Sequence, residues 1–246
     1  AVYVLIMNAD GTVAAEQKIA RGVGGMATTV PDKNDEFGSS VTSPGDINGD
    51  GVPDLVVGAI GDDDGGTNNG AVYVLMMNSD GTVAATEKLA DGAGGFTASL
   101  NNNDNFGWSV GALGDLNADG VGDIIVGAAR DDDGNTDAGA AYIIYLNADG
   151  TTSYHQKISD TEGNFYGELT KKDRLGSATI SLGDLDGNCL PELFVGAYLD
   201  DSDLGHGKNI GAGWVMWLGE GTPDLRADDG PGVENYFMNR ADTVSY

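Results

Sequence analysis

Short apolar runs separated by polar loops make up most of the chain. Between residues 37 and 89 the sequence holds four such runs, at 37–41, 55–59, 71–77 and 82–89. Runs of this length, bounded by Gly, Asp and Asn, are typical of β-strands. The segment 78–81, Asn-Ser-Asp-Gly, predicts a hairpin turn because its glycine tolerates a positive φ. No stretch shows the periodicity of a helix, so the sequence predicts an all-β chain.

The four-strand pattern recurs along the chain. Phe37-Gly38 returns as Phe106-Gly107 and again as Leu175-Gly176, each time 69 residues further on. The opening residues, AVYVLIMNADGTVAA, are nearly repeated from Ala71. We therefore expect repeats up to about residue 218, with a partial unit at 1–20 and fuller units at 37–90, 106–158 and 175–218. Residues 219–246 are rich in Gly, Asp and Pro, and we expect them to form a C-terminal tail or linker.

A four-stranded unit repeated at this scale is typical of a β-propeller blade. One small sheet cannot bury both of its faces, whereas sheets stacked around an axis bury them all. A β-helix, or a β-sandwich with duplicated hairpins, is the alternative. Propellers typically have 4–8 blades, and this chain holds about 3.5 repeats. The sequence therefore predicts a partial propeller, either cut from a longer one or completed by blades of other chains.

Composition and charge exclude several classes of protein. The 246 residues include 39 acidic and 12 basic side chains, giving a formal net charge of −27. Such a chain is unsuited to nucleic acids or anionic membranes, and it has no apolar run long enough to span a bilayer. A single cysteine excludes a disulfide-stapled scaffold within the chain. The chain opens inside an expected strand, which suggests a mature or truncated piece of a longer protein.

Three acidic loops in register carry the strongest chemical signal. Each has oxygen-bearing side chains at positions 1, 3, 5 and 9, an arrangement typical of a loop that wraps a hard cation, with position 7 adding its backbone carbonyl. An all-protein oxygen cage suits Ca²⁺ better than Mg²⁺, and His or Cys clusters for zinc are missing. Polar turns without a metal are the alternative. The predicted ligands are Asp46, Asn48, Asp50, Val52 and Asp54; Asp115, Asn117, Asp119, Val121 and Asp123; and Asp184, Asp186, Asn188, Leu190 and Glu192.

The third loop departs from the pattern at two positions. Cys189 stands at position 6, where the other loops have Gly51 and Gly120, and a left-handed conformation there costs a non-glycine residue about 1 kcal/mol or more. Glu192 stands at position 9 in place of aspartate. We therefore expect about three Ca²⁺ sites, the third being the weakest.

These motifs resemble FG-GAP repeats, the blades of the integrin α-subunit propeller. Phe37-Gly38 and Gly58-Ala59 match the motif in the first full repeat, and Phe106-Gly107 and Gly127-Ala128 match it in the second; Leu175-Gly176 and Gly196-Ala197 diverge further. The resemblance implies a propeller, usually of seven blades, with Ca²⁺ in the loops between strands one and two. It also implies an extracellular setting and a role in adhesion or ligand binding.

A second set of acidic residues recurs between strands two and three. It comprises Asp62 to Asp64, Asp131 to Asp133, and Asp200, Asp201 and Asp203. A solvated, charged loop is the favoured interpretation, and further cation binding or a basic partner is the alternative.

No catalytic constellation is recognisable, since the two histidines, His155 and His206, lie in different parts of the repeat. We expect a non-enzymatic, extracellular, calcium-binding module for adhesion or for recognition of a protein or glycan. The alternative is a structural subunit of an extracellular filament, sheath or appendage, in which further copies assemble through blade edges and calcium. Neither nucleic acid binding nor membrane insertion is expected.

Overall fold

The chain folds into β-strands joined by loops. The computed structural model describes residues 1–165, 167–201 and 209–219, and the backbone of 238–243. Within these ranges there are fourteen strands and no helix, so none of the described residues forms a helix that could cross a membrane. The expected all-β class is confirmed.

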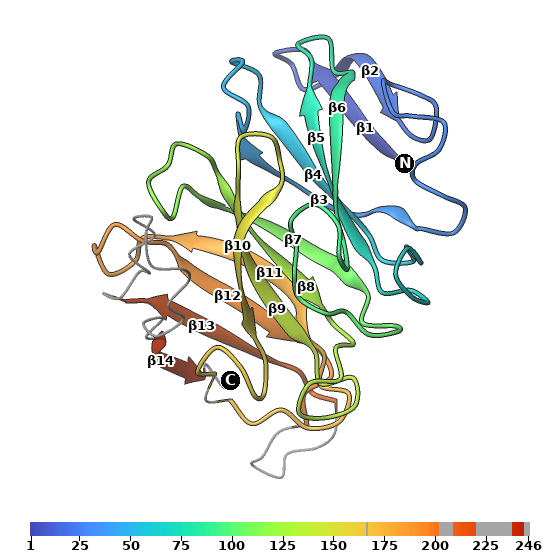
Figure 1. The fold of residues 1–246 in the computed structure, drawn as a ribbon. Coiled ribbons are helices and arrows are strands. Elements are labelled where there is room, and N and C mark those ends of the chain that lie inside the picture. Colours follow the sequence, from blue (N-terminus) through green and yellow to red (C-terminus); the bar gives the residue numbers. More distant parts are fainter. Residues whose placement is uncertain (166, 202–208, 220–237, 244–246) are drawn as a thin grey trace.

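The strands form one two-stranded and three four-stranded sheets, all antiparallel (Figure 1). Each four-stranded sheet pairs consecutive strands in order, which matches the expected repeat unit. The first sheet holds β1 (Val2–Met7) and β2 (Val13–Ile19). The second holds β3 (Phe37–Gly45), β4 (Asp54–Ala59), β5 (Ala71–Met77) and β6 (Val83–Leu89). The third holds β7 (Phe106–Gly114), β8 (Asp123–Ala128), β9 (Ala140–Leu146) and β10 (Thr152–Ile158), and the fourth holds β11 (Leu175–Gly183), β12 (Glu192–Ala197), β13 (Ala212–Leu218) and β14 (Met238–Thr243).

Strand β14 corrects our expectation for the end of the chain. Residues 219–246 read as a tail or linker because they contain few apolar residues. The structure places Met238–Thr243 beside β13, as the fourth strand of the fourth sheet. Backbone pairing does not require an apolar side chain at each position, which is why composition alone missed this strand. Residues 220–237 lie outside the described part of the chain.

The sheets stack face to face, and alternate side chains of each central strand point to opposite neighbours. In β5, Val72 and Val74 pack into the core shared with the third sheet, whereas Tyr73 and Leu75 pack into the core shared with the first. Burial on both faces explains why β5 is an uninterrupted apolar run that is buried throughout. The expected propeller architecture is confirmed as a partial propeller of successive blades.

Small residues let the innermost strands of neighbouring blades approach closely. Ser40 Oγ donates to the Gly107 carbonyl at 2.8 Å, and Ser109 Oγ donates to the Gly176 carbonyl at 2.9 Å. A Cβ on Gly58 would lie 2.1 Å from the Gly107 oxygen, well inside van der Waals contact. The glycine of each Gly-Ala pair in β4 and β8 is therefore required by the stacking itself.

Candidate metal loops

Three loops of the same length and shape connect the first two strands of the four-stranded sheets. They join β3 to β4, β7 to β8 and β11 to β12. Since β3 packs on β7 and β7 on β11, the loops leave the same end of the stack. Gly122 of the second loop would place a Cβ 2.1 Å from the carbonyl oxygen of Pro44, which precedes the first loop.

Each loop is wrapped around the aspartate at its first position. Asp46 Oδ1 accepts hydrogen bonds from the backbone N–H of Gly49 and Asp50, and its Oδ2 accepts one from Gly51, at 2.7–3.1 Å. Asp184 accepts from the three corresponding residues of its loop, and Asp115 accepts from Asp119 N and Gly120 N. These N–H groups orient the carboxylate and carry only partial positive charge, so they leave its formal charge uncompensated.

The side chains at positions 3 and 5 also turn into the loop. Asp50 N donates to Asn48 Oδ1 at 3.0 Å, and Val52 N donates to Asp50 Oδ1 at 2.8 Å. The second loop repeats both contacts, at 3.2 and 2.8 Å. The third loop also repeats them, with Asp186 at position 3 and Asn188 at position 5. In each loop the side chains at positions 1, 3 and 5 thus bond to the loop's own backbone. Among the described residues, however, the three carboxylates come within 4.8 Å of one another only in the third loop. The carbonyls of Val52, Val121 and Leu190 stay predicted ligands.

The carboxylate at position 9 differs between the loops. Asp54 is fully buried, and its two oxygens accept from Ile47 N at 2.9 Å and from Met77 N at 2.8 Å. Asp123 is equally buried and accepts from Leu116 N and Leu146 N. These aspartates therefore also tie the loop to the end of the third strand of its sheet, a role that the sequence did not reveal.

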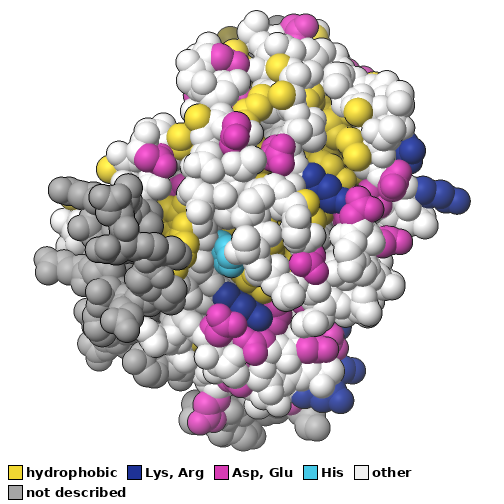
Figure 2. Space-filling view, in the orientation of Figure 1, with side chains coloured by type: hydrophobic (Ala, Val, Ile, Leu, Met, Phe, Trp, Pro, Cys, Tyr) yellow, Lys and Arg dark blue, Asp and Glu magenta, His cyan; other side chains and the backbone are white. Residues whose placement is uncertain are grey.

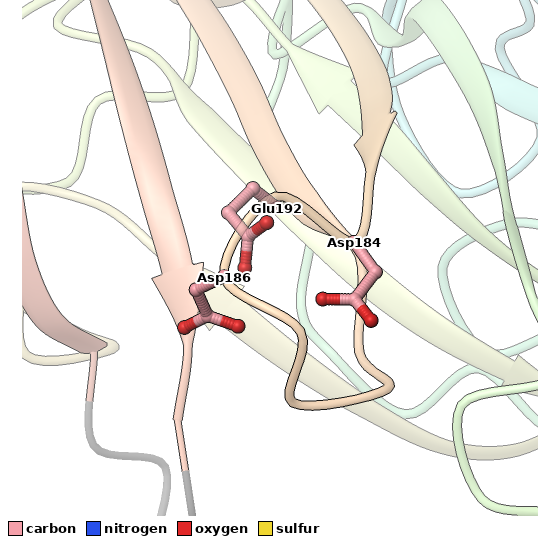
Figure 3. A group of neighbouring side chains, drawn as sticks. All are labelled: Asp184, Asp186 and Glu192. Atoms are coloured by element: carbon pink, nitrogen blue, oxygen red, sulfur yellow. The ribbon is translucent and has the colours of Figure 1, made fainter.

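Glu192, at position 9 of the third loop, differs from Asp54 and Asp123 in the hydrogen bonds of its two carboxylate oxygens. Its Oε2 accepts from Leu185 N, whereas its Oε1 is buried and has no hydrogen-bond partner in the described part of the chain. Ligand atoms of Glu192, Asp184 and Asp186 lie within 4.8 Å of one another, and the three carboxylates surround the same turn (Figure 3). A buried carboxylate oxygen without a partner carries a desolvation cost that a cation would remove.

Position 6 is left-handed in all three loops, as expected. The φ angle is +89° at Gly51, +91° at Gly120 and +72° at Cys189, so the cysteine holds a conformation that suits glycine. Position 4 is also left-handed, with a φ of +75° at Gly49, +60° at Ala118 and +82° at Gly187. The glycines of the first and third loops were the signal for it in the sequence.

Burial sets the proton affinity of one position-9 carboxyl. Desolvation raises the pKa of Asp123 to about 7, against the lowering effect of the two N–H groups that it accepts from, while the neighbouring charges of Asp119 and Asp115 raise it further. A bound cation would favour the ionised form of such a group.

The second set of acidic residues proves to be mainly structural. Asp62 is buried, with Tyr73 Oη donating to its Oδ2 at 3.0 Å and Lys88 Nζ to its Oδ1 at 2.6 Å. One repeat later, Asp131 is also buried and accepts from Tyr142 Oη and Lys157 Nζ, both at 3.0 Å.

The expectation of a solvated loop is therefore wrong for Asp62 and Asp131, although Asp64 is exposed. The sequence did hold a signal for this role. Tyr73 recurs as Tyr142 and Lys88 recurs as Lys157, each after 69 residues, which is the same step that separates Asp62 from Asp131. Asp203 and His206 lie outside the described residues.

Comparison with known proteins agrees with this architecture. The FG-GAP repeat family matches residues 37–75 and 106–144. The chain is 33% identical to integrin alpha-PS2 of Drosophila melanogaster over 172 residues, covering 67% of this chain and 12% of that protein. It is 31% identical to Xenopus laevis integrin alpha-5 and 31% identical to human integrin alpha-7, covering 68% and 71% of this chain. The chain spans only 15% and 13% of the lengths of these two relatives. Fold, repeat register and sequence similarity together show that the chain is an FG-GAP repeat protein with integrin α-like blades.

Proposed function

We propose that the chain is a non-catalytic, extracellular, calcium-binding module that recognises a protein or a glycan. The observation that carries the proposal is the third loop, where three carboxylates converge and the buried Glu192 Oε1 has no partner among the residues that the structure describes. The first and second loops repeat the same backbone wrapping around Asp46 and Asp115. Each loop would hold one ion through the side chains at positions 1, 3, 5 and 9 and the carbonyl at position 7.

The donor set supports a hard cation. All of its side-chain donors are carboxylate or amide oxygens, and each loop holds three carboxylates. The ion pairs found among the described residues all lie elsewhere, at Arg21, Lys88 and Lys157. A carboxylate offers about four lone-pair sites, so Asp54 and Asp123 can keep their N–H partners and still bind an ion. Such flexible oxygen cages favour Ca²⁺ over Mg²⁺.

The ranking of the third site rests on two opposing features. The longer Glu192 and the left-handed Cys189 led us to expect the weakest binding there. The left-handed φ of +72° at Cys189 strains the loop itself and therefore lowers the stability of the loop. The partnerless Oε1 of Glu192 favours binding.

Calorimetric titration of Ca²⁺ into the chelator-treated chain tests the proposal. The Glu192→Gln variant keeps the size of the side chain and an oxygen acceptor for Leu185 N, but it removes one of the three carboxylates. We expect it to lose one equivalent of tight binding. Glu16→Gln, an exposed position on β2, serves as the matched control and should titrate like the unmodified chain. Identical titrations for all three proteins would contradict the assignment of the third loop.

Adhesion or recognition is proposed from the similarity to integrin α subunits, with loops on one face of the blades contacting the ligand. Immobilised extracellular matrix proteins and a glycan array, probed with the chain in calcium and in chelator, test this role. Calcium-dependent capture by a defined protein or glycan is the expected result. Absence of binding to both would disfavour a recognition role.

A structural subunit of an extracellular assembly is the second candidate function. Large apolar side chains of β1 and β11, including Leu5 and Ile180, are about half exposed, and such surfaces favour association. Light scattering of native material, in calcium and then in chelator, distinguishes the two roles. A large assembly that dissociates in chelator would support the structural role, whereas small particles that capture a ligand would support recognition.

A further inference from the structure

Two asparagines of the chain directly precede a glycine. They are Asn48, in the first metal loop, and Asn69, in the loop between β4 and β5. The backbone nitrogen that follows an asparagine can attack the carbon of the side-chain amide and expel ammonia. Glycine permits this attack best, because it has no Cβ and the widest choice of φ. The structure places these two chemically equivalent pairs in opposite surroundings.

The Asn69–Gly70 pair is buried and held by its neighbours. Asn69 is 1% exposed, and its Nδ2 donates to the Leu100 carbonyl at 3.1 Å. Gly70 N donates to the Asp62 carbonyl at 3.1 Å. A Cβ on Gly70 would lie 2.2 Å from the Phe106 oxygen, so the backbone has little room to turn toward the Asn69 side chain. We expect this pair to be inert while the chain is folded.

The Asn48–Gly49 pair is exposed and has space around it. Gly49 has a φ of +75°, and a Cβ placed on it would meet no atom within 4 Å. Among the described residues, the hydrogen-bond partners of the pair belong to the same loop. Gly49 N donates to Asp46 Oδ1 at 2.8 Å, and Asn48 Nδ2 donates to Asp50 Oδ2 at 2.9 Å. Opening of this one turn therefore frees both reacting groups.

We propose that Asn48 is a site of spontaneous deamidation in the folded protein. Gly49 N gives up its proton to the solvent and attacks Asn48 Cγ, and the bond from Cγ to Nδ2 breaks as Nδ2 takes up a proton and leaves as ammonia. Water then opens the cyclic imide at either of its carbonyls and leaves aspartate or isoaspartate at position 48. The net reaction consumes one water and releases one ammonia, so it needs no oxidant and no cofactor.

The charge of the chain makes the local geometry decisive. Acidic side chains are spread over the face shown in Figure 2, and the formal net charge is −27. A negative potential disfavours the anionic nitrogen that attacks, so an asparagine without a following glycine should react slowly. Asn117 is the internal comparison, because it occupies the place of Asn48 in the second loop and also donates to an aspartate at 2.9 Å, but is followed by Ala118.

The reaction would change the first metal loop, and this consequence rests on the proposed function. Aspartate would add a carboxylate at position 3, where the third loop already has Asp186. Isoaspartate lengthens the main chain by one carbon and would displace the N–H groups of Gly49 and Asp50 from Asp46 Oδ1. A bound calcium ion would hold Asn48 in place and oppose ring closure. Asn48 would then report the time that the loop spends without an ion.

Peptide mapping of the aged full chain by mass spectrometry tests the site. The chain is kept at mildly alkaline pH in calcium and in chelator, and circular dichroism confirms that it stays folded. We expect Asn48 to deamidate faster than Asn69 and Asn117 in both media. In urea, where the chain is unfolded, Asn48 and Asn69 should react at similar rates.

Gly49→Ala is the matched variant. The second loop holds Ala118 at the equivalent position with a φ of +60°, so the loop accommodates alanine there. The variant should slow deamidation of Asn48 by about tenfold and leave the rate at Asn117 unchanged. The proposal would be overturned if folded chains lost Asn69 as fast as Asn48, or if Asn48 reacted no faster than Asn117.

The calcium dependence separates this inference from the proposed function. We expect calcium to slow the reaction at Asn48 several-fold. If calorimetry showed that calcium binds and the rate at Asn48 were the same in calcium and in chelator, control by the ion would be wrong. If no calcium bound and Asn48 still reacted first, the proposed function would fail and the assignment of Asn48 would stand.

Discussion

The two sets of acidic loops have similar composition but opposite electrostatic arrangements. Between strands two and three, the buried Asp62 and Asp131 each receive a lysine ammonium and a tyrosine hydroxyl. Between strands one and two, Asp46 and Asp115 receive backbone N–H groups alone among the described partners. The first arrangement supplies its own cation, whereas the second has no lysine or arginine partner among the described residues, which is why we propose that it binds an external cation. Counting acidic residues does not separate the two, whereas locating their partners does.

Removal of calcium should give the largest effect. Each ion that binds only the folded chain stabilises it by about 2.7 kcal/mol at a free concentration 100 times its Kd. Three sites together would then add several kcal/mol. We expect the midpoint of urea unfolding to fall sharply in chelator and to recover when Ca²⁺ is added back. If the midpoint of unfolding were the same in calcium and in chelator, the proposed difference between the two sets of loops would be contradicted.

Loss of the lysine ammonium that pairs with Asp131 should have the next largest effect on stability. Lys157→Met leaves Asp131, which is 1% exposed, without its ammonium partner, and we expect a loss of about 3 kcal/mol in the free energy of unfolding. The Asp131→Asn/Lys157→Met double variant removes both charges and should lose less. Calcium affinity should stay unchanged in both variants. If the single variant were as stable as the wild type, the structural role of this ion pair would be wrong.

The pH dependence of stability should reveal the buried Asp104 beside the second acidic set. Burial raises the pKa of this carboxyl to about 7, against the lowering effect of the hydrogen bond from Asn101 N, and the charge of Asp131 raises it further. The folded chain therefore binds an extra proton between pH 4 and 7, and its stability falls as the pH rises through that window.

The slope that this group contributes is at most about 1.4 kcal/mol per pH unit, and it should vanish above the folded pKa. Urea unfolding of wild type and Asp104→Asn from pH 4.5 to 7.5 measures it as the difference between two curves. Parallel curves would show that Asp104 titrates normally.

Relief of strain in the third loop should give the smallest effect. Cys189→Gly removes a left-handed non-glycine residue and should stabilise the chain by about 0.5–1 kcal/mol in calcium and in chelator alike. Ala118→Gly, at the other left-handed non-glycine position within the metal loops, is the parallel test. A large gain in calcium affinity, rather than in stability, would show that the strain opposes binding.

The sequence was most informative where the repeat constrains the chain. Strand β5 was predicted with its observed ends, because burial on both faces makes it continuously apolar. The loops were located by the recurrence of Asp46, Asp115 and Asp184, and the left-handed position 6 followed from Gly51 and Gly120.

Other features depend on contacts that sequence spacing does not display. Asp62 meets Lys88 across 26 residues, so its burial appeared only in three dimensions. Strand β14 pairs through its backbone. Glu192 Oε1 has no hydrogen-bond partner among the described residues, whereas both oxygens of Asp54 and Asp123 accept from backbone N–H groups.

The calcium content of the folded chain tests the central claim most directly. Equilibrium dialysis against buffered Ca²⁺, followed by elemental analysis, counts the ions bound per chain. The account predicts three, one for each loop that opens with Asp46, Asp115 or Asp184. A count above three would mean that the lysine-paired set also binds metal, and a chain that binds no calcium at millimolar concentration would contradict the account.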